Sequence, residues 1–205
     1  MKKPLLFFIV PLALVMGVYS ALMIIDPPPI KLQAATWLGE QARPLPAFSM
    51  TDHNQQPFDN QSIQGKWQLL FFGYTHCPDI CPDTLQVLAD AYDSIYDLTA
   101  KDSLQIVFVS IDPERDSLSR MKAYVEHFHK GFLSARSSLP ELQPLTQALG
   151  IHHSVEIVAD GKVQVEHSGV LILVDPQGRF SGLFSSPHNA EEIAHDLVAL
   201  IKGRT

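Results

Sequence analysis

The chain carries little charge, and most of that charge is acidic. Only 18% of its 205 residues are charged, with 15 Lys and Arg against 22 Asp and Glu and a formal net charge of −7. Such a chain repels phosphate backbones, because nucleic-acid binding depends on neutralisation by Lys and Arg. The sequence has no internal repeat and no low-complexity tract apart from three consecutive prolines at 27–29. This composition argues against a nucleic-acid partner and favours one globular domain with additional segments.

Cysteine is almost absent, since the chain contains only Cys77 and Cys81. In an oxidising compartment, two lone cysteines form a structural disulfide by default. Their four-residue spacing would close a very small loop, which removes little chain entropy and therefore stabilises little. We interpret the pair as a site of chemistry, and a structural disulfide in an interaction domain remains the alternative.

The longest uncharged stretch, Leu5–Ile25, lies at the N-terminus. About 20 apolar residues span a bilayer, so this stretch is long enough for a membrane anchor. Lys2 and Lys3 precede it, and the positive-inside bias keeps that end in the cytoplasm. A signal peptide cleaved near Ser20 is the alternative, but its apolar core would be only about 7–15 residues long. In both cases the globular part lies outside the cytoplasm.

The sequence therefore divides into three parts. We expect a single-pass anchor over residues 1–25 in the inner (cytoplasmic) membrane and a proline-containing linker over 26–43. A globular domain over 44–205 follows, in the periplasm.

Apolar residues in this domain alternate between strand and helix patterns. Two continuous apolar runs, Gln68–Gly73 and Leu104–Ile111, are typical of strands buried on both faces. Hairpins are expected around residues 48–58 and 155–165, a strand over 169–174 and an edge strand over 180–184. Helices are predicted from about Pro82, from Asp116 or Ser117, over Leu139–Leu149, and from Asn189 to Ile201.

This order predicts an α/β sandwich with a mixed central sheet and an N-terminal hairpin. A cysteine pair at the junction of the first core strand and the first helix favours the thioredoxin-like architecture. Cys81 would stand at the start of the helix, where the helix dipole favours a thiolate.

Two thiolates are soft ligands that suit Cu(I), Zn or an iron–sulfur cluster, and each of these needs at least a third donor. Nine histidines are available, and most of them are interpreted as solvated or packed side chains. His167 differs because it precedes the strand at 169–174. In a thioredoxin-like fold the loop before that strand packs against the cysteine motif and normally carries a cis proline. No proline stands in that loop of this sequence. His167 is therefore the candidate third ligand.

Three segments of the chain together resemble one protein family. Residues 72–82 (FGYTHCPDICP) look like the signature of the SCO/SenC family of copper proteins, which serve cytochrome c oxidase assembly. Residues 110–116 (SIDPERD) resemble its second landmark, and His167-Ser168 before an apolar strand and residues 175–178 (DPQG) resemble its third. The similar layout covers roughly residues 44–201. Glu166 departs from the family, which commonly has Asp before the histidine.

The resemblance implies that Cys77, Cys81 and His167 bind copper, as Cu(I) or Cu(II). It also implies a monomeric metallochaperone that delivers copper to the CuA centre of cytochrome c oxidase subunit II or to another cuproprotein. Asp79 is a weak extra ligand or, more simply, a helix cap, and Glu166 could tune the site from outside. Asp112, Arg115 and Asp116 are expected to fix their loop rather than touch metal.

Two enzymatic alternatives stay open. The first is a thiol–disulfide reductase that keeps the cysteines of the copper acceptor reduced. Cys77 and Cys81 could serve both functions, because their disulfide and their copper-binding dithiol form interconvert by transfer of two electrons. The second is a peroxidase of the peroxiredoxin or glutathione peroxidase type. His167 and the residues around the cysteines disfavour this second reading.

Overall fold

The computed structural model describes residues 11–20, 31–96, 98–151, 153–157, 163–167 and 169–203; for residues 98, 153–157 and 163–167 it describes the backbone alone. Residues 11–20 are helical. In the part of the chain that is described, no helix is both long enough and apolar enough to cross a bilayer. The predicted anchor, Leu5–Ile25, lies mostly outside the described residues.

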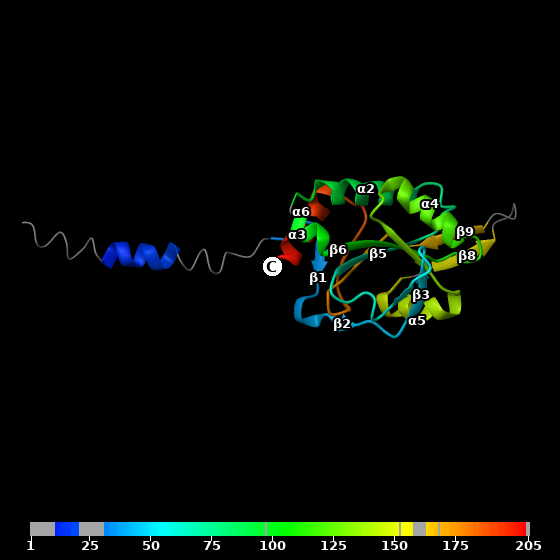
Figure 1. Ribbon diagram of the computed structural model, residues 1–205, viewed down its shortest axis with the longest axis horizontal. Helices are drawn as coiled ribbons and strands as arrows, with labels where there is room; N and C mark the ends of the chain where they lie inside the picture. The colour runs from blue at the N-terminus through cyan, green and yellow to red at the C-terminus, as the bar shows by residue number, and fades with distance from the viewer. Residues whose placement is uncertain are drawn as a thin grey trace, which may run out of the picture.

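A mixed nine-stranded sheet forms the centre of the domain (Figure 1). Its path runs β1-β11-β10-β5-β6-β7-β3-β4, and β2 pairs with β11 beside β1. β5, β6 and β7 are parallel, whereas β10 is antiparallel to β5. The strands are β1 (Ala35–Trp37), β2 (Arg43–Pro44), β3 (Ser49–Asp52), β4 (Pro57–Asp59), β5 (Trp67–Gly73), β6 (Leu104–Ser110), β7 (Leu133–Arg136), β10 (Leu171–Val174) and β11 (Arg179–Phe184). A separate antiparallel pair consists of β8 (His153–Ile157) and β9 (Val163–His167).

Helices cover both faces of the sheet, and Figure 1 shows α2, α4 and α6 on one side and α5 on the other. The helices are α2 (Ile80–Ser94), α3 (Leu98–Asp102), α4 (Leu118–Phe128), α5 (Leu139–Leu149), α6 (Ala190–Ile201) and the short 3-10 turn η1 (Gly39–Gln41). The start and the stop of α5 agree with the sequence prediction. Ser138 and Glu141 form a capping box at its start, and Gly150 ends it with a φ of 68°.

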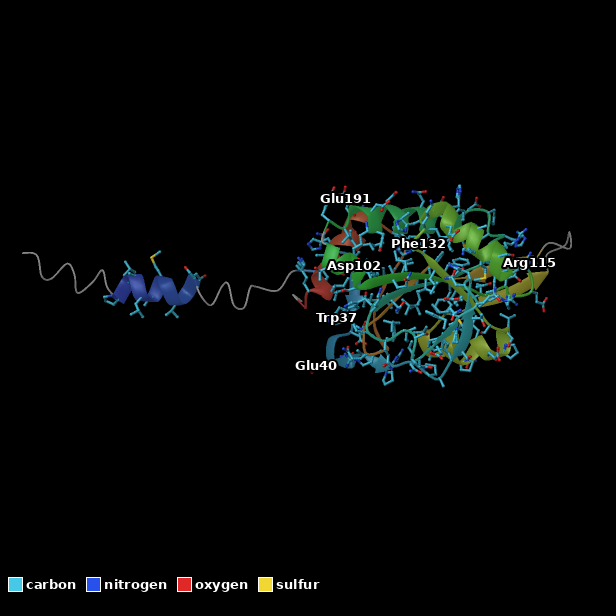
Figure 2. The ribbon with its side chains drawn as sticks, in the orientation of Figure 1. Trp37, Glu40, Asp102, Arg115, Phe132 and Glu191 are labelled. Atoms are coloured by element: carbon cyan, nitrogen blue, oxygen red, sulfur yellow. The ribbon has the colours of Figure 1, made fainter. Side chains whose placement is uncertain are left out.

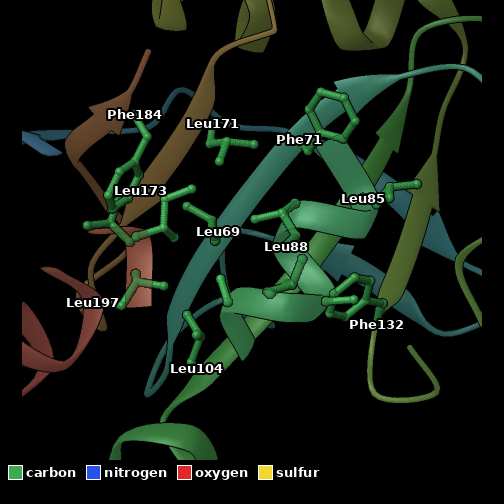
Figure 3. Packing of buried hydrophobic residues seen from close by; sticks show 14 of the residues in the cluster. Leu69, Phe71, Leu85, Leu88, Leu104, Phe132, Leu171, Leu173, Phe184 and Leu197 are labelled. Atoms are coloured by element: carbon green, nitrogen blue, oxygen red, sulfur yellow. The ribbon is translucent and has the colours of Figure 1, made fainter. Parts of the chain in front are cut away.

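Alternate side chains of β5 enter two separate cores, as expected for a strand buried on both faces. Leu69 and Phe71 pack with α2, α4 and α6, whereas Leu70 and Phe72 pack with α5 and the β3–β4 hairpin. Figure 3 shows the first of these cores, in which Leu69 and Phe71 of β5 belong to the same cluster as Leu88 of α2 and Leu171 of β10. Both faces of β5 are therefore buried up to the point where the chain leaves the strand for α2.

Two sequence predictions are wrong at the β11 side of the sheet. β11 is not an edge strand, because it pairs with β10 on one side and with β1 and β2 on the other. Part of the predicted linker 26–43 supplies those strands and is therefore folded onto the domain. Its signal was weak because β1 and β2 are only three and two residues long. The strand β7 and the helix α3 were also not predicted.

A buried carboxylate of α6 holds the beginning of this N-terminal segment. Asp196 is fully buried and accepts the backbone N–H groups of Gln33, Ala34 and Ala35 at 2.8–3.0 Å. Its other partner is His195 Nδ1, at 2.9 Å. Burial raises the pKa of Asp196, but the hydrogen bonds from His195 and the three amides outweigh burial, so the pKa is lowered.

Candidate metal centre

The two cysteines lie where the sequence analysis predicted, between the first buried strand and the first long helix. β5 ends at Gly73, Cys77 stands in the following loop, and Cys81 is the second residue of α2. Asp79 occupies the N-cap position of α2, but its side chain makes no capping hydrogen bond. The helix-cap prediction for Asp79 is therefore right about the position and wrong about the interaction.

The two thiols differ in exposure. Cys81 is fully buried, whereas Cys77 is half-buried, and no disulfide joins these two described residues. The backbone N–H of Cys81 lies 3.4 Å from Cys77 Sγ, so it can stabilise a thiolate there. The pKa of Cys81 is raised well above its usual range. The larger cause is a hydrogen bond with the Cys77 side chain, and the second is burial of the thiol. Cys77 is consequently the thiol that meets an incoming reactant first.

Gly73 makes room for the buried sulfur. A Cβ atom at this position would lie 2.8 Å from Cys81 Sγ and 2.8 Å from Phe108 Cε2. Real Cβ atoms do not approach other heavy atoms so closely. The absence of a side chain at the end of β5 therefore allows the Cys81 sulfur to sit against the strand.

Asp116 fixes the chain just before Cys77. It is fully buried and accepts Thr75 Oγ1 at 2.6 Å, the Thr75 backbone N–H at 3.1 Å and Ser110 Oγ at 2.7 Å. These bonds tie the end of β6 to the cysteine loop. The expectation that Asp116 fixes a loop is confirmed by its contacts.

Two arginines, Arg115 in the β6–α4 loop and Arg120 in α4, make contacts next to this network. Arg115 pairs with Asp112 and also lies over the Tyr74 ring, 5.9 Å from its centroid. Arg120 Nη1 lies 2.9 Å from His76 Nε2. Because a guanidinium only donates, His76 accepts through Nε2 and carries its proton on Nδ1. Figure 2 places Arg115 at the opposite end of the domain from Trp37, which contacts Trp67 at the start of β5.

His167 is the last residue of β9, and its side chain falls outside the described residues. In the backbone register it is the partner of His153, the first residue of strand β8. The loop that follows His167 does reach the cysteine motif, as expected. A Cβ atom on Gly169 would lie 3.7 Å from Ile80 Cγ2. Among the side chains that are described, no group of three His, Cys, Asp or Glu residues is arranged to hold a metal ion.

Two features of the site had not been singled out from the sequence. One is the steric role of Gly73, for which the only signal is a glycine directly after a continuous apolar run. The other is His188, which follows β11 and contacts Gly169. His188 lies about 20 residues from His167 in the chain, and no spacing pattern links the two.

Comparison with known proteins gives one consistent family. A family model described as SCO1/SenC matches residues 38–202. A candidate copper-binding protein of Stutzerimonas stutzeri is 36% identical over 155 residues, which are 76% of this chain and 76% of that protein. Protein SCO1 homolog 1, mitochondrial, of Arabidopsis thaliana is 32% identical over 76% of this chain. The match spans only 46% of the Arabidopsis protein, about half its length.

Solved structures agree. ScoI of Arabidopsis thaliana with copper bound has a TM-score of 0.71 at 30% identity, over 78% of this chain and 99% of that chain. Yeast Sco1 with copper bound has a TM-score of 0.71 at 25% identity, over 80% of this chain and 91% of that chain. The predicted thioredoxin-like α/β fold with a mixed sheet is therefore confirmed.

Proposed function

Because this chain belongs to the SCO1/SenC family, we propose that it is a copper metallochaperone whose ligands are Cys77, Cys81 and His167. The observation that supports this most directly is the cysteine pair. Both thiols are held at the β5–α2 junction, and one of them is accessible. Copper-bound relatives share this fold over most of their length.

The donor set suits copper as cargo. Two thiolates and one neutral imidazole give a three-coordinate site with soft sulfur donors, which Cu(I) prefers. Cys81 is buried against Phe108 and Gly73, so it is the fixed donor of the pair. Cys77 is half-buried and lies in a loop, so it is the donor that a ligand from an acceptor protein reaches first. Three-coordinate Cu(I) accepts such an incoming ligand, which permits hand-over without release of free metal.

The acceptor and the cellular location are part of the proposal. We infer that copper passes to the CuA centre of cytochrome c oxidase subunit II or to another cuproprotein. The chain would act as a monomer, anchored in the inner membrane through Leu5–Ile25 with its domain in the periplasm. Lys2 and Lys3, which precede the apolar stretch, support this orientation.

Thiol–disulfide reduction is the second candidate function. The observation that favours it is the closeness of the two cysteines, because the backbone N–H of Cys81 lies 3.4 Å from Cys77 Sγ. Such a pair exchanges a disulfide with a substrate through the more accessible sulfur, which here is Cys77. A reductase needs both cysteines and has no chemical use for an imidazole ligand at residue 167.

His167→Ala separates the two functions. We expect it to leave the Cys77–Cys81 redox couple largely intact but to weaken Cu(I) binding by about 10-fold or more, which is about 1.4 kcal/mol or more. The measurement is an anaerobic titration of the reduced protein with Cu(I) against a competing chelator. In cells, oxidase activity should fall and should recover partly with added copper, as for Cys77→Ser and Cys81→Ser. Normal oxidase assembly in His167→Ala cells, with assembly lost in either cysteine variant, would instead identify a reductase.

A further inference from the structure

His188 lies in the connection between β11 and α6 and contacts the loop that follows His167. Its Nε2 atom is 2.5 Å from the backbone carbonyl oxygen of Gly169. A carbonyl oxygen only accepts hydrogen bonds, so Nε2 carries the proton and donates it. The chain positions of the two residues differ by 19, so this bond joins two separate loops.

Gly169 is also the point at which its loop reaches the cysteine motif. A Cβ atom on Gly169 would lie 3.7 Å from Ile80 Cγ2 and 3.9 Å from Ser186 Cβ, which are ordinary contact distances. Ile80 directly precedes Cys81, and Ser186 stands two residues before His188. Three segments therefore meet at Gly169: the cysteine loop, the loop after His167, and the connection that carries His188.

His188 is followed directly by a packed helix. Asn189 follows it as the N-cap of α6, and its Oδ1 accepts the backbone N–H of Glu192 at 3.1 Å. α6 packs against α2 in the first core, through residues such as Ile193 and Leu197. The imidazole is thus held at the start of a packed helix.

The other ring nitrogen of His188 gives a second, independent observation. Nδ1 is buried and has no hydrogen-bond partner among the described residues. A buried polar atom without a partner is unfavourable, so its presence in a folded protein requires an explanation. We explain the unpartnered Nδ1 by the other nitrogen: the ring stays in this position because Nε2 donates to the Gly169 carbonyl.

We propose that His188 is a positioning residue that holds the loop carrying His167 against the cysteine loop. The inference rests on the proposed copper site, and it adds a residue to that site that does not touch the metal. Mutation of residues that orient a metal ligand without touching the metal commonly lowers metal affinity by about 10- to 100-fold. By fixing the Gly169 carbonyl, His188 limits the positions that the backbone of His167 can take relative to Cys77 and Cys81.

The test uses three variants of the full-length chain in detergent. His188→Ala removes the donor, and His188→Gln restores an N–H donor at about the same reach. His127→Ala is the matched control, because His127 is an exposed histidine on α4. We expect His188→Ala to weaken Cu(I) binding by about 10-fold or more and to shift the thiolate-to-Cu(II) charge-transfer band. His188→Gln should recover most of the affinity, and His127→Ala should match the unaltered protein.

Hydrogen exchange of the copper-free protein tests the loop itself. The backbone amides of residues 169–171 should exchange faster in His188→Ala than in the unaltered protein. Equal exchange rates would overturn the proposal whatever the copper affinity is, and so would faster exchange with unchanged copper affinity. His167→Ala and Cys81→Ser, measured alongside, distinguish the two failures. If they also bind copper normally, the copper site itself is wrong; if they do not, only the role of His188 is wrong.

Discussion

Replacement of Gly73 by alanine tests the account of the buried sulfur, because it adds a single methyl group between β5 and α2. The new Cβ would lie 2.8 Å from Cys81 Sγ and 2.8 Å from Phe108 Cε2. Favourable separations between such atoms are about 3.5–4.0 Å, so each neighbour has to withdraw by roughly 0.7 Å or more. The backbone itself imposes no strain, because Gly73 is not among the residues with a positive φ.

Both neighbours belong to the buried core. Phe108 is fully buried, and its ring packs against Phe71 and Tyr124 at centroid distances of 6.0 and 5.7 Å. Cys81 is also fully buried, and rotation of its short side chain would carry the sulfur away from its present position beside Cys77. Overpacking of this kind costs about 1–3 kcal/mol. For a domain of this size that corresponds to a fall in Tm of about 2–12 °C.

Copper binding should suffer as well, because metal–ligand distances tolerate deviations of only about 0.2 Å. We expect Gly73→Ala to weaken Cu(I) binding by about 10-fold or more, equivalent to about 1.4 kcal/mol. The assays are thermal unfolding and the chelator competition described above. Gly169→Ala is the matched control for thermal unfolding alone, because its Cβ meets Ile80 at an ordinary 3.7 Å. Its stability should stay within about 0.5 kcal/mol of the unaltered protein.

A double-mutant cycle identifies which collision matters. In a Cys81→Ala background the sulfur is gone, so Gly73→Ala should cost less than in the unaltered protein, with a coupling of about 0.5 kcal/mol or more. Unchanged melting and copper affinity in Gly73→Ala would refute the packing argument. A full cost that persists without the sulfur would assign the collision to Phe108 alone.

Two further predictions concern buried carboxylates. Asp116→Asn replaces a carboxylate that accepts hydrogen bonds from two hydroxyls, so it should lower the free energy of unfolding in urea by about 1–3 kcal/mol. Asp79→Asn is the control, because Asp79 is exposed and makes no capping bond. It should change the free energy of unfolding by less than about 0.5 kcal/mol. Asp196→Asn should also destabilise by about 1–3 kcal/mol at pH 7. Because the folded pKa of Asp196 is lowered, its stabilisation is fully present above the unfolded value, near 3.8, and is lost as pH falls through the folded pKa. Urea unfolding at pH 7 and in acid should therefore show the gap between Asp196→Asn and the unaltered protein closing in acid, and a gap that is constant with pH would contradict this assignment.

The sequence by itself determined the central part of the fold. Continuous apolar runs over 68–73 and 104–111 have one physical solution, burial on both faces of a sheet, and the structure places β5 and β6 there. Local chemistry was equally informative where it acts over a few residues. Ser117, one of the two predicted caps, accepts the backbone N–H of Arg120 at the start of α4, and α5 has its predicted bounds, Leu139–Leu149. The cysteine pair at the strand–helix junction follows from the same local signals.

Only the tertiary structure decided the features that depend on residues far apart in the chain. β1 and β2 are too short to be recognised as strands, and they form because β11 offers an unpaired edge and Asp196 binds the amides before them. Asp196 and Ala34 are 162 residues apart, and no periodicity relates them. The same holds for the space that Gly73 leaves for Cys81 and for the bond from His188 to Gly169. Local sequence patterns report on neighbours along a helix or strand, whereas these contacts arise only when packing brings distant segments together.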